Sequence, residues 1–202
     1  TAANTLVHAA ARLVAIGESH RAIRLLLETD VVIGQGGVGG DAPIEAQVLR
    51  AHALCNIGDL AGAEQAALSA LEDAVDSGSG RLRACARREL GRVAWYQGDL
   101  PRAVVRLRRA RDAAAHLGET YLQARTEVDL ANALLPTGAF DEAEMRLMHA
   151  IKVFRGAGDP EGLARALLAA GELRRQQRRW AAGVTVLRRG LEGEHGHGQT
   201  EE

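Results

Sequence analysis

Small residues recur at fixed distances on either side of a short polar turn around Gly98, within residues 89–118. Gly91 lies seven residues before Gly98 and Ala103 lies five residues after it, so the two flank the turn at similar distances. In an antiparallel helix pair such residues lie side by side, and their small side chains let the two backbones approach closely. Ala110 follows two helical turns after Ala103 on the same stripe, where it can receive the next helix. The pattern therefore predicts a helical hairpin with two faces for packing.

The same hairpin pattern occurs five times along the chain. The turn glycines Gly17, Gly58, Gly98 and Gly138 follow one another at a nearly constant step of about 40 residues. Three columns of small residues keep the same step. They are Ala10, Ala51, Gly91, Ala131 and Gly171; then Ala22, Ala63, Ala103, Ala143 and Gly183; and then Thr29, Ala70, Ala110, Ala150 and Gly190. Repetition at this length is typical of an all-α solenoid of stacked hairpins.

These columns resemble the tetratricopeptide repeat (TPR), as does the bulky residue that opens each second helix at Leu60, Leu100, Phe140 and Trp180. The period is longer than the usual repeat of about 34 residues, and is similar to repeats of bacterial signalling ATPases, transcription regulators and caspase-like CHAT proteins. The resemblance implies a right-handed α-α superhelix of five hairpins over residues 1–192. The expected repeats are 2–30, 43–77, 81–118, 119–158 and 160–192.

Three segments interrupt this regularity. Residues 31–42 are glycine-rich and contain a G-x-G-x-x-G pattern at Gly34, Gly36 and Gly39. A dinucleotide site needs a strand before this pattern and a βαβ unit around it. The flanks here are repeat helices, so we expect an inter-repeat loop, with a phosphate or partner contact as the alternative. Pro136 is expected to shorten a first helix, and the fifth repeat has Arg178 where the others have a turn glycine. The polar tail 193–202 is predicted to be disordered.

Composition narrows the function classes. The net charge is −1, from 25 basic and 26 acidic residues, so no global field favours nucleic acid or a membrane surface. Lys152 is the only lysine, which suggests a GC-rich, bacterial coding sequence. Cys55 and Cys85 are the only cysteines, and the predicted register places them roughly 15 Å apart, so two free thiols and a cytoplasmic location are expected.

Motifs for catalysis are missing from these 202 residues, including zinc-protease, nucleophile-elbow and Walker patterns. We therefore predict neither an enzyme nor a bound cofactor or metal. His195 and His197 could hold a metal weakly, but a solvated pair in the tail is the prediction.

A binding groove is the better candidate site. The family resemblance implies that first helices line a concave side. The residues expected there are Arg88, Arg92, Trp95, Tyr96, Arg125, Asn132, His52 and Asn56. A guanidinium fork takes a carboxylate with two hydrogen bonds, and an amide can hold the adjacent peptide backbone. The set is similar to the carboxylate clamp of chaperone-binding TPR domains, but the first repeat offers only Val7 and Ala11. The alternative is that the arginines pair with Glu or Asp, or are solvated.

Positions are also predicted for two further groups of side chains, the arginines of one second helix and the two tryptophans. Five arginines of one second helix are predicted to form a solvated convex face; these are Arg102, Arg106, Arg108, Arg109 and Arg111. Trp180 shares the bulky column and is expected in the core, whereas Trp95 could belong to the groove floor or to the packing.

The sequence thus predicts a non-catalytic module that binds an acidic or carboxylate-bearing peptide, or a partner domain, in its groove. Two alternatives stay open. The chain could be the sensor or scaffold region of a larger bacterial transcription regulator or signalling ATPase, or it could be the TPR half of a CHAT protease. The terminal repeats could also support a homo-oligomer.

Overall fold

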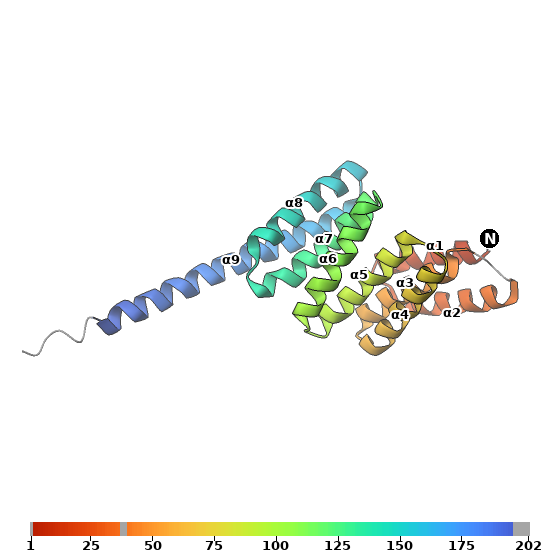
Figure 1. Ribbon diagram of the computed structural model, residues 1–202, viewed down its shortest axis with the longest axis horizontal. Coiled ribbons are helices and arrows are strands. Elements are labelled where there is room, and N and C mark those ends of the chain that lie inside the picture. The colour runs from red at the N-terminus through yellow and green to blue at the C-terminus, as the bar shows by residue number, and fades with distance from the viewer. Residues whose placement is uncertain (1, 37–39, 196–202) are drawn as a thin grey trace, which may run out of the picture.

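The computed structural model describes residues 2–36 and 40–195, and within them the chain is helical throughout, without strands (Figure 1). The helices are α1 Ala2–Ala15, α2 Ser19–Gly36, α3 Ala42–Ile57, α4 Leu60–Asp76, α5 Gly80–Tyr96, α6 Leu100–His116, α7 Thr120–Leu134, α8 Phe140–Ala157 and α9 Pro160–His195. Each odd helix up to α7 packs against the helix that follows it, and each even helix packs against the next odd one. The predicted TPR-like solenoid is therefore confirmed.

Glycine and aspartate together make the hairpin turns. Gly58 and Gly98 have φ of 85° and 79°, in the left-handed region that a side chain disfavours. The next residue, Asp59 or Asp99, then accepts a hydrogen bond from a backbone N–H in the first turn of the following helix, at 2.9 and 3.1 Å. A Gly-Asp pair therefore ends one helix and starts its antiparallel partner.

The small columns are buried, as predicted. In the first four copies the residues of all three columns are buried, and the alanines among them are fully so. A Cβ added at Gly91 would lie 2.6 Å from Leu107 Cγ, so this position has room only for glycine. The close approach of the paired helices thus depends on the absence of side-chain volume.

The fifth hairpin does not form, so the prediction of five hairpins is wrong at its last copy. Helix α9 runs for 36 residues without a turn and projects beyond the other helices (Figure 1). The cause is local, because Arg178 replaces the turn glycine and Gln176 to Arg179 are all good helix formers. Trp180 is consequently 54% exposed, and its ring meets Phe140 edge-on at 6.1 Å between centroids. The expectation that Trp180 lies in the core is wrong.

Two other boundaries differ from the predictions. Helix α2 continues to Gly36, so much of the expected loop 31–42 is helical, because Val32 and Ile33 keep a partly buried face. Gly34 and Gly36 lie in this helix rather than after a strand, and Gly39 lies outside the described residues. Residues 193–195 of the expected tail belong to α9, whereas 196–202, including His197, lie outside the described part.

Two smaller predictions are confirmed, namely the early end of a first helix at Pro136 and the two free thiols. Helix α7 ends at Leu134, and a 3-10 turn at Leu135–Thr137 contains Pro136. Cys55 and Cys85 are both free thiols. None of the helices described combines the length and the apolar character needed to cross a membrane.

Candidate functional site

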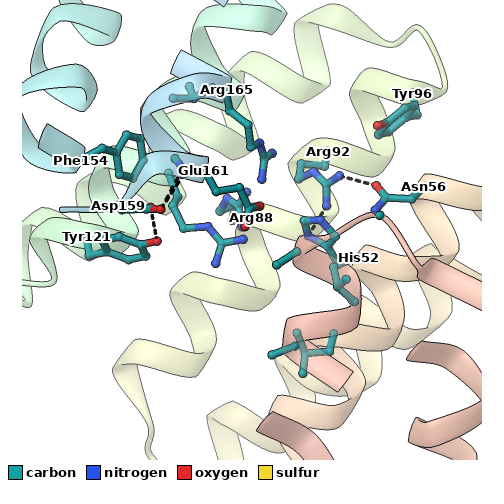
Figure 2. A pocket seen from close by; sticks show the side chains of 18 residues that line it. His52, Asn56, Arg88, Arg92, Tyr96, Tyr121, Phe154, Asp159, Glu161 and Arg165 are labelled. Carbon is teal, nitrogen blue, oxygen red and sulfur yellow. Dashed lines mark hydrogen bonds between the residues drawn. The ribbon is translucent and has the colours of Figure 1, made fainter. Parts of the chain in front are cut away.

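The first helices of all the repeats converge on one pocket of about 410 Å³ (Figure 2). Helices α1, α3, α5, α7 and α9 each contribute side chains to its wall, and Phe154 from α8 closes one side. Figure 2 shows His52, Asn56, Arg92 and Tyr96 on one side and Tyr121, Asp159 and Arg165 on the other. The concave side expected from the resemblance is therefore a real cavity.

The residues predicted for the groove come together at this place. Six of them line the pocket, namely His52, Asn56, Arg88, Arg92, Tyr96 and Arg125. The other two, Trp95 and Asn132, line a smaller pocket of about 140 Å³ that shares Arg92, Tyr96 and Arg165 with the first. Trp95 also meets Tyr96 edge-on at 4.8 Å, so it belongs to the groove and to the packing at once.

Glu89 is the centre of a buried ionic network beneath the pocket wall. Its Oε2 accepts a hydrogen bond from Arg92 Nη1 at 2.6 Å, and its Oε1 accepts one from Arg88 Nη1 at 3.1 Å. Burial acts to raise the pKa of Glu89, but the charges of Arg92 and Arg88 hold it well below the usual value. Glu89 is therefore ionised and neutralises part of the charge of both arginines.

Asp129 supplies the second buried carboxylate. Its Oδ2 lies 2.6 Å from Arg88 Nε, and its Oδ1 lies 3.8 Å from Arg165 Nη2. Arg88 thus lies between Glu89 and Asp129, and two buried carboxylates balance the two buried arginines Arg88 and Arg92. The sequence left open that these arginines pair with acidic residues. This alternative is correct for Arg88 and Arg92.

His52 is neutral in this network. Arg92 Nη1 lies 2.5 Å from His52 Nδ1, and because a guanidinium can only donate, this nitrogen is the acceptor. Burial and the adjacent charge of Arg92 lower the pKa of His52 to about 4. The second guanidinium nitrogen of Arg92 donates to Asn56 Oδ1 at 3.2 Å, and Asn56 Nδ2 donates to Ser19 Oγ at 3.2 Å. The network therefore connects α5 to α3 and to the first hairpin.

Arg125 has a different environment. Its side chain lines the pocket and is only partly exposed, yet it makes no ion pair or hydrogen bond with any side chain in the described ranges. The charge of Arg88, followed by burial, lowers the pKa of Arg125 to about 10. It still carries a positive charge at neutral pH, so it is a cation in a pocket without a carboxylate partner of its own.

The start of α9 forms the wall beside Arg125. Asp159 accepts hydrogen bonds from the backbone N–H groups of Glu161 and Gly162, at 3.1 and 3.0 Å, and from the Tyr121 hydroxyl at 2.7 Å (Figure 2). These donors hold Asp159 at the helix N-terminus. It makes no close ion pair with Arg125 there, although the charge of Arg125 attracts it from a longer distance.

Several residues of the site were not predicted, among them Tyr121, Asp159, Glu89, Asp129 and Arg165. A signal for the two carboxylates exists, because Glu89 and Asp129 occupy the same position in consecutive repeats. Each follows a groove position directly, at Arg88 and at Val128. A signal for Arg165 exists as well, because it stands one repeat after Arg125.

The arginines of α6 are less solvated than predicted. Arg102 and Arg106 lie 3.2 and 3.6 Å from Glu64 of α4, and Arg108 lies 2.6 Å from Glu142 of α8. These pairs connect neighbouring second helices across the outer surface, while Arg109 stays exposed. Among the described residues there is no cluster of three or more His, Cys, Asp or Glu side chains suited to a metal ion.

Comparison with known proteins gives the fold a context. No protein-family model matches the sequence, and no curated protein matches it significantly. Solved structures do match it. A Rap protein complexed with Competence and Sporulation Factor superposes with a TM-score of 0.69 and 16% identity, over 95% of this chain and 59% of that chain. This chain therefore spans about three fifths of the Rap chain that it matches.

Two structures of the putative kinesin light chain of Podosopora anserina, with nearly identical TPR-like repeats, also match. One of them, a substituted variant, has a TM-score of 0.56 and 17% identity, over 94% of this chain and 96% of that one. The other has the same TM-score and 19% identity, over 90% and 95% of the two chains. At these identities the likeness concerns the fold, and the chain has the fold of a TPR-type helical repeat protein.

Proposed function

We propose that this chain is a protein-interaction module whose concave pocket binds a peptide segment bearing a carboxylate, with Arg125 as the charged anchor. The observation that carries the proposal is that no hydrogen bond or close ion pair connects Arg125 to another side chain among the described residues, while Glu89 and Asp129 attract it only from a longer distance. A partly buried guanidinium is stabilised when a carboxylate binds it with two hydrogen bonds. A ligand carboxylate could supply this contact.

The rest of the pocket suits a short peptide. Its volume of about 410 Å³ lies in the range of pockets that enclose small ligands. Tyr96 is 43% exposed and offers an aromatic surface, while the amide of Asn132 can hold a peptide backbone group. Arg88 and Arg92 are paired in the buried network around Glu89, so in this proposal their main role is to hold this wall in place.

One of the similar structures supports an interaction role. The Rap protein was solved in a complex with Competence and Sporulation Factor, and it superposes on nearly the whole of this chain. We extend the proposal to a module without catalytic residues of its own, acting in a bacterial cytoplasm. A regulator or signalling protein is the favoured context, and the CHAT protease remains the alternative.

The test compares two variants that each remove one positive charge. Octapeptides with free C-termini are selected on the wild-type protein from a random library, and the affinity of the selected peptides is measured by calorimetry. Arg125→Gln is expected to weaken their binding by about tenfold or more, because it removes a partly desolvated charge contact. Arg109→Gln, on the exposed outer side of α6, is the matched control and should leave the affinity unchanged.

The selected sequences provide a second criterion. They should be rich in Asp and Glu, and replacing their carboxylates by amides should weaken binding to wild type but not to Arg125→Gln. Wild-type binding that survives replacement of every side-chain and C-terminal carboxylate by an amide, or equal binding by the two variants, would refute a carboxylate site at Arg125.

A further inference from the structure

Helix α9 has one packed face and one open face. Ala166, Ala169 and Leu173 are buried where α9 meets the preceding hairpin. The open face contains Ala164, Leu168, Gly171 and Arg175, and all of them are exposed. Leu168 is 75% exposed, and an added Cβ at Gly171 would meet no atom within 4 Å.

The corresponding face is covered in the complete hairpins. One repeat earlier the counterparts are Ala124, Val128, Ala131 and Leu135, and all four are buried. In the first hairpin the counterparts are Ala3, Val7, Ala10 and Val14, which are also buried. At Gly91, in the same column as Gly171, the covering side chain is Leu107 of the second helix. Helix α9 therefore presents a hairpin face whose covering helix is missing.

The sequence contains a segment with the pattern of that covering helix. Trp180, Gly183, Leu187 and Gly190 stand one repeat after Phe140, Ala143, Leu147 and Ala150. In α8 the last three of these four are buried. The segment 180–190 thus has the small and large residues that the open face requires, in the order in which α8 uses them.

This segment cannot reach the open face of its own chain. Helix α9 continues straight through residues 176–179, and a left-handed turn residue there would be strained without glycine. Trp180 also contacts Phe140 of the preceding hairpin in the same chain, which holds the helix in line. The end of α9 instead projects away from the body of the molecule (Figure 1), where a second molecule can meet it.

We infer that the open face of α9 is covered by segment 180–190 of a second copy, in a dimer that exchanges the missing second helix. Exchange of an element between identical chains keeps the contacts of the closed hairpin without needing its turn. Gly171 and Gly183 are twelve positions apart and lie about 120° apart around a continuous helix. The two long helices must therefore cross rather than run parallel.

The test measures self-association by sedimentation velocity over a wide range of protein concentration. The wild-type chain is expected to form a dimer, and Leu168→Glu should weaken it by about tenfold or more, because the charge would be buried in the interface. Leu27→Glu, on another exposed leucine that lies on α2 and is 56% exposed, is the matched control and should dimerise like wild type.

A second variant separates exchange from simple docking. Arg178→Gly with Arg179→Asp restores the Gly-Asp turn found at Gly58 and Gly98, so α9 can fold back on itself. This variant should be a monomer with unchanged helix content by circular dichroism. The inference is overturned if wild type stays monomeric at all concentrations, if Leu168→Glu dimerises normally, or if the turn variant remains a dimer.

Discussion

At Glu89, a single buried carboxylate accepts hydrogen bonds from two buried guanidinium groups, so the residue connects the stability of the fold to the shape of the pocket. A buried ion pair adds little net stability over a hydrophobic replacement, but removing one partner leaves uncompensated charge. The loss of stability caused by such a change therefore measures how far Glu89 compensates the charges of Arg88 and Arg92.

Glu89→Gln is expected to lower the free energy of unfolding by about 3 to 5 kcal/mol, because Arg88 and Arg92 lose a shared anion. Urea titration at neutral pH measures the change. Glu64→Gln is the control, since its carboxylate pairs with Arg102 at the surface, and should cost no more than about 1 kcal/mol. Equal losses for the two variants would contradict the buried network.

The pH dependence of stability should show the neutral state of His52. Its pKa is about 4 in the folded chain, below the usual value of about 6.5, so the folded state excludes a proton that the unfolded state binds. Its contribution to stability is thus complete above pH 6.5 and is lost as the pH falls towards 4. The loss should be about 1.4 kcal/mol per pH unit.

Urea titrations at pH 6.5 and pH 5 test this linkage. His52→Gln keeps a hydrogen-bond acceptor but does not titrate, so its stability should fall by about 2 kcal/mol less than that of wild type between these values. The exposed His116→Gln serves as control and should behave like wild type. The linkage is absent if His52→Gln and wild type lose stability in parallel.

At the scale of the helices, glycine has opposite consequences at two positions of one column. Gly91 faces Leu107 across a closed hairpin, whereas Gly171 faces open space on α9. The column itself is visible in the sequence as a regular repeat. The sequence does not show whether the fifth member of the column is packed. Its packing depends on a turn near Arg178, and the chain does not make that turn.

The substitution to alanine should therefore change stability in opposite directions. Gly91→Ala puts a methyl group 2.6 Å from Leu107 Cγ and is expected to destabilise the chain by about 1 to 3 kcal/mol. Gly171→Ala should stabilise it by about 0.5 to 1 kcal/mol, because alanine is the better helix former and meets no obstacle. Thermal unfolding at low protein concentration measures both. A loss of stability for Gly171→Ala would mean that another helix already packs tightly there.

At the scale of the whole molecule, periodicity predicted the solenoid and the convergence of its first helices. The same register placed eight predicted residues around two neighbouring pockets. The register could not show which of the arginines Arg88, Arg92 and Arg125 form ion pairs within the chain, since the three have the same side chain. The difference comes from Glu89 and Asp129, which reach the first two but leave Arg125 without a partner in the described part of the chain.

The measurement that tests the central claim most directly locates the ligand with the two tryptophans. Trp95 lines the smaller pocket and meets Tyr96, which lines both pockets, whereas Trp180 lies on α9 against Phe140. Their indole N–H signals in NMR therefore report on separate places. Trp180→Phe assigns the two signals. Titration with a selected acidic peptide should shift the Trp95 signal and leave the Trp180 signal in place. A peptide that binds without shifting Trp95 would contradict a binding site in the concave pocket.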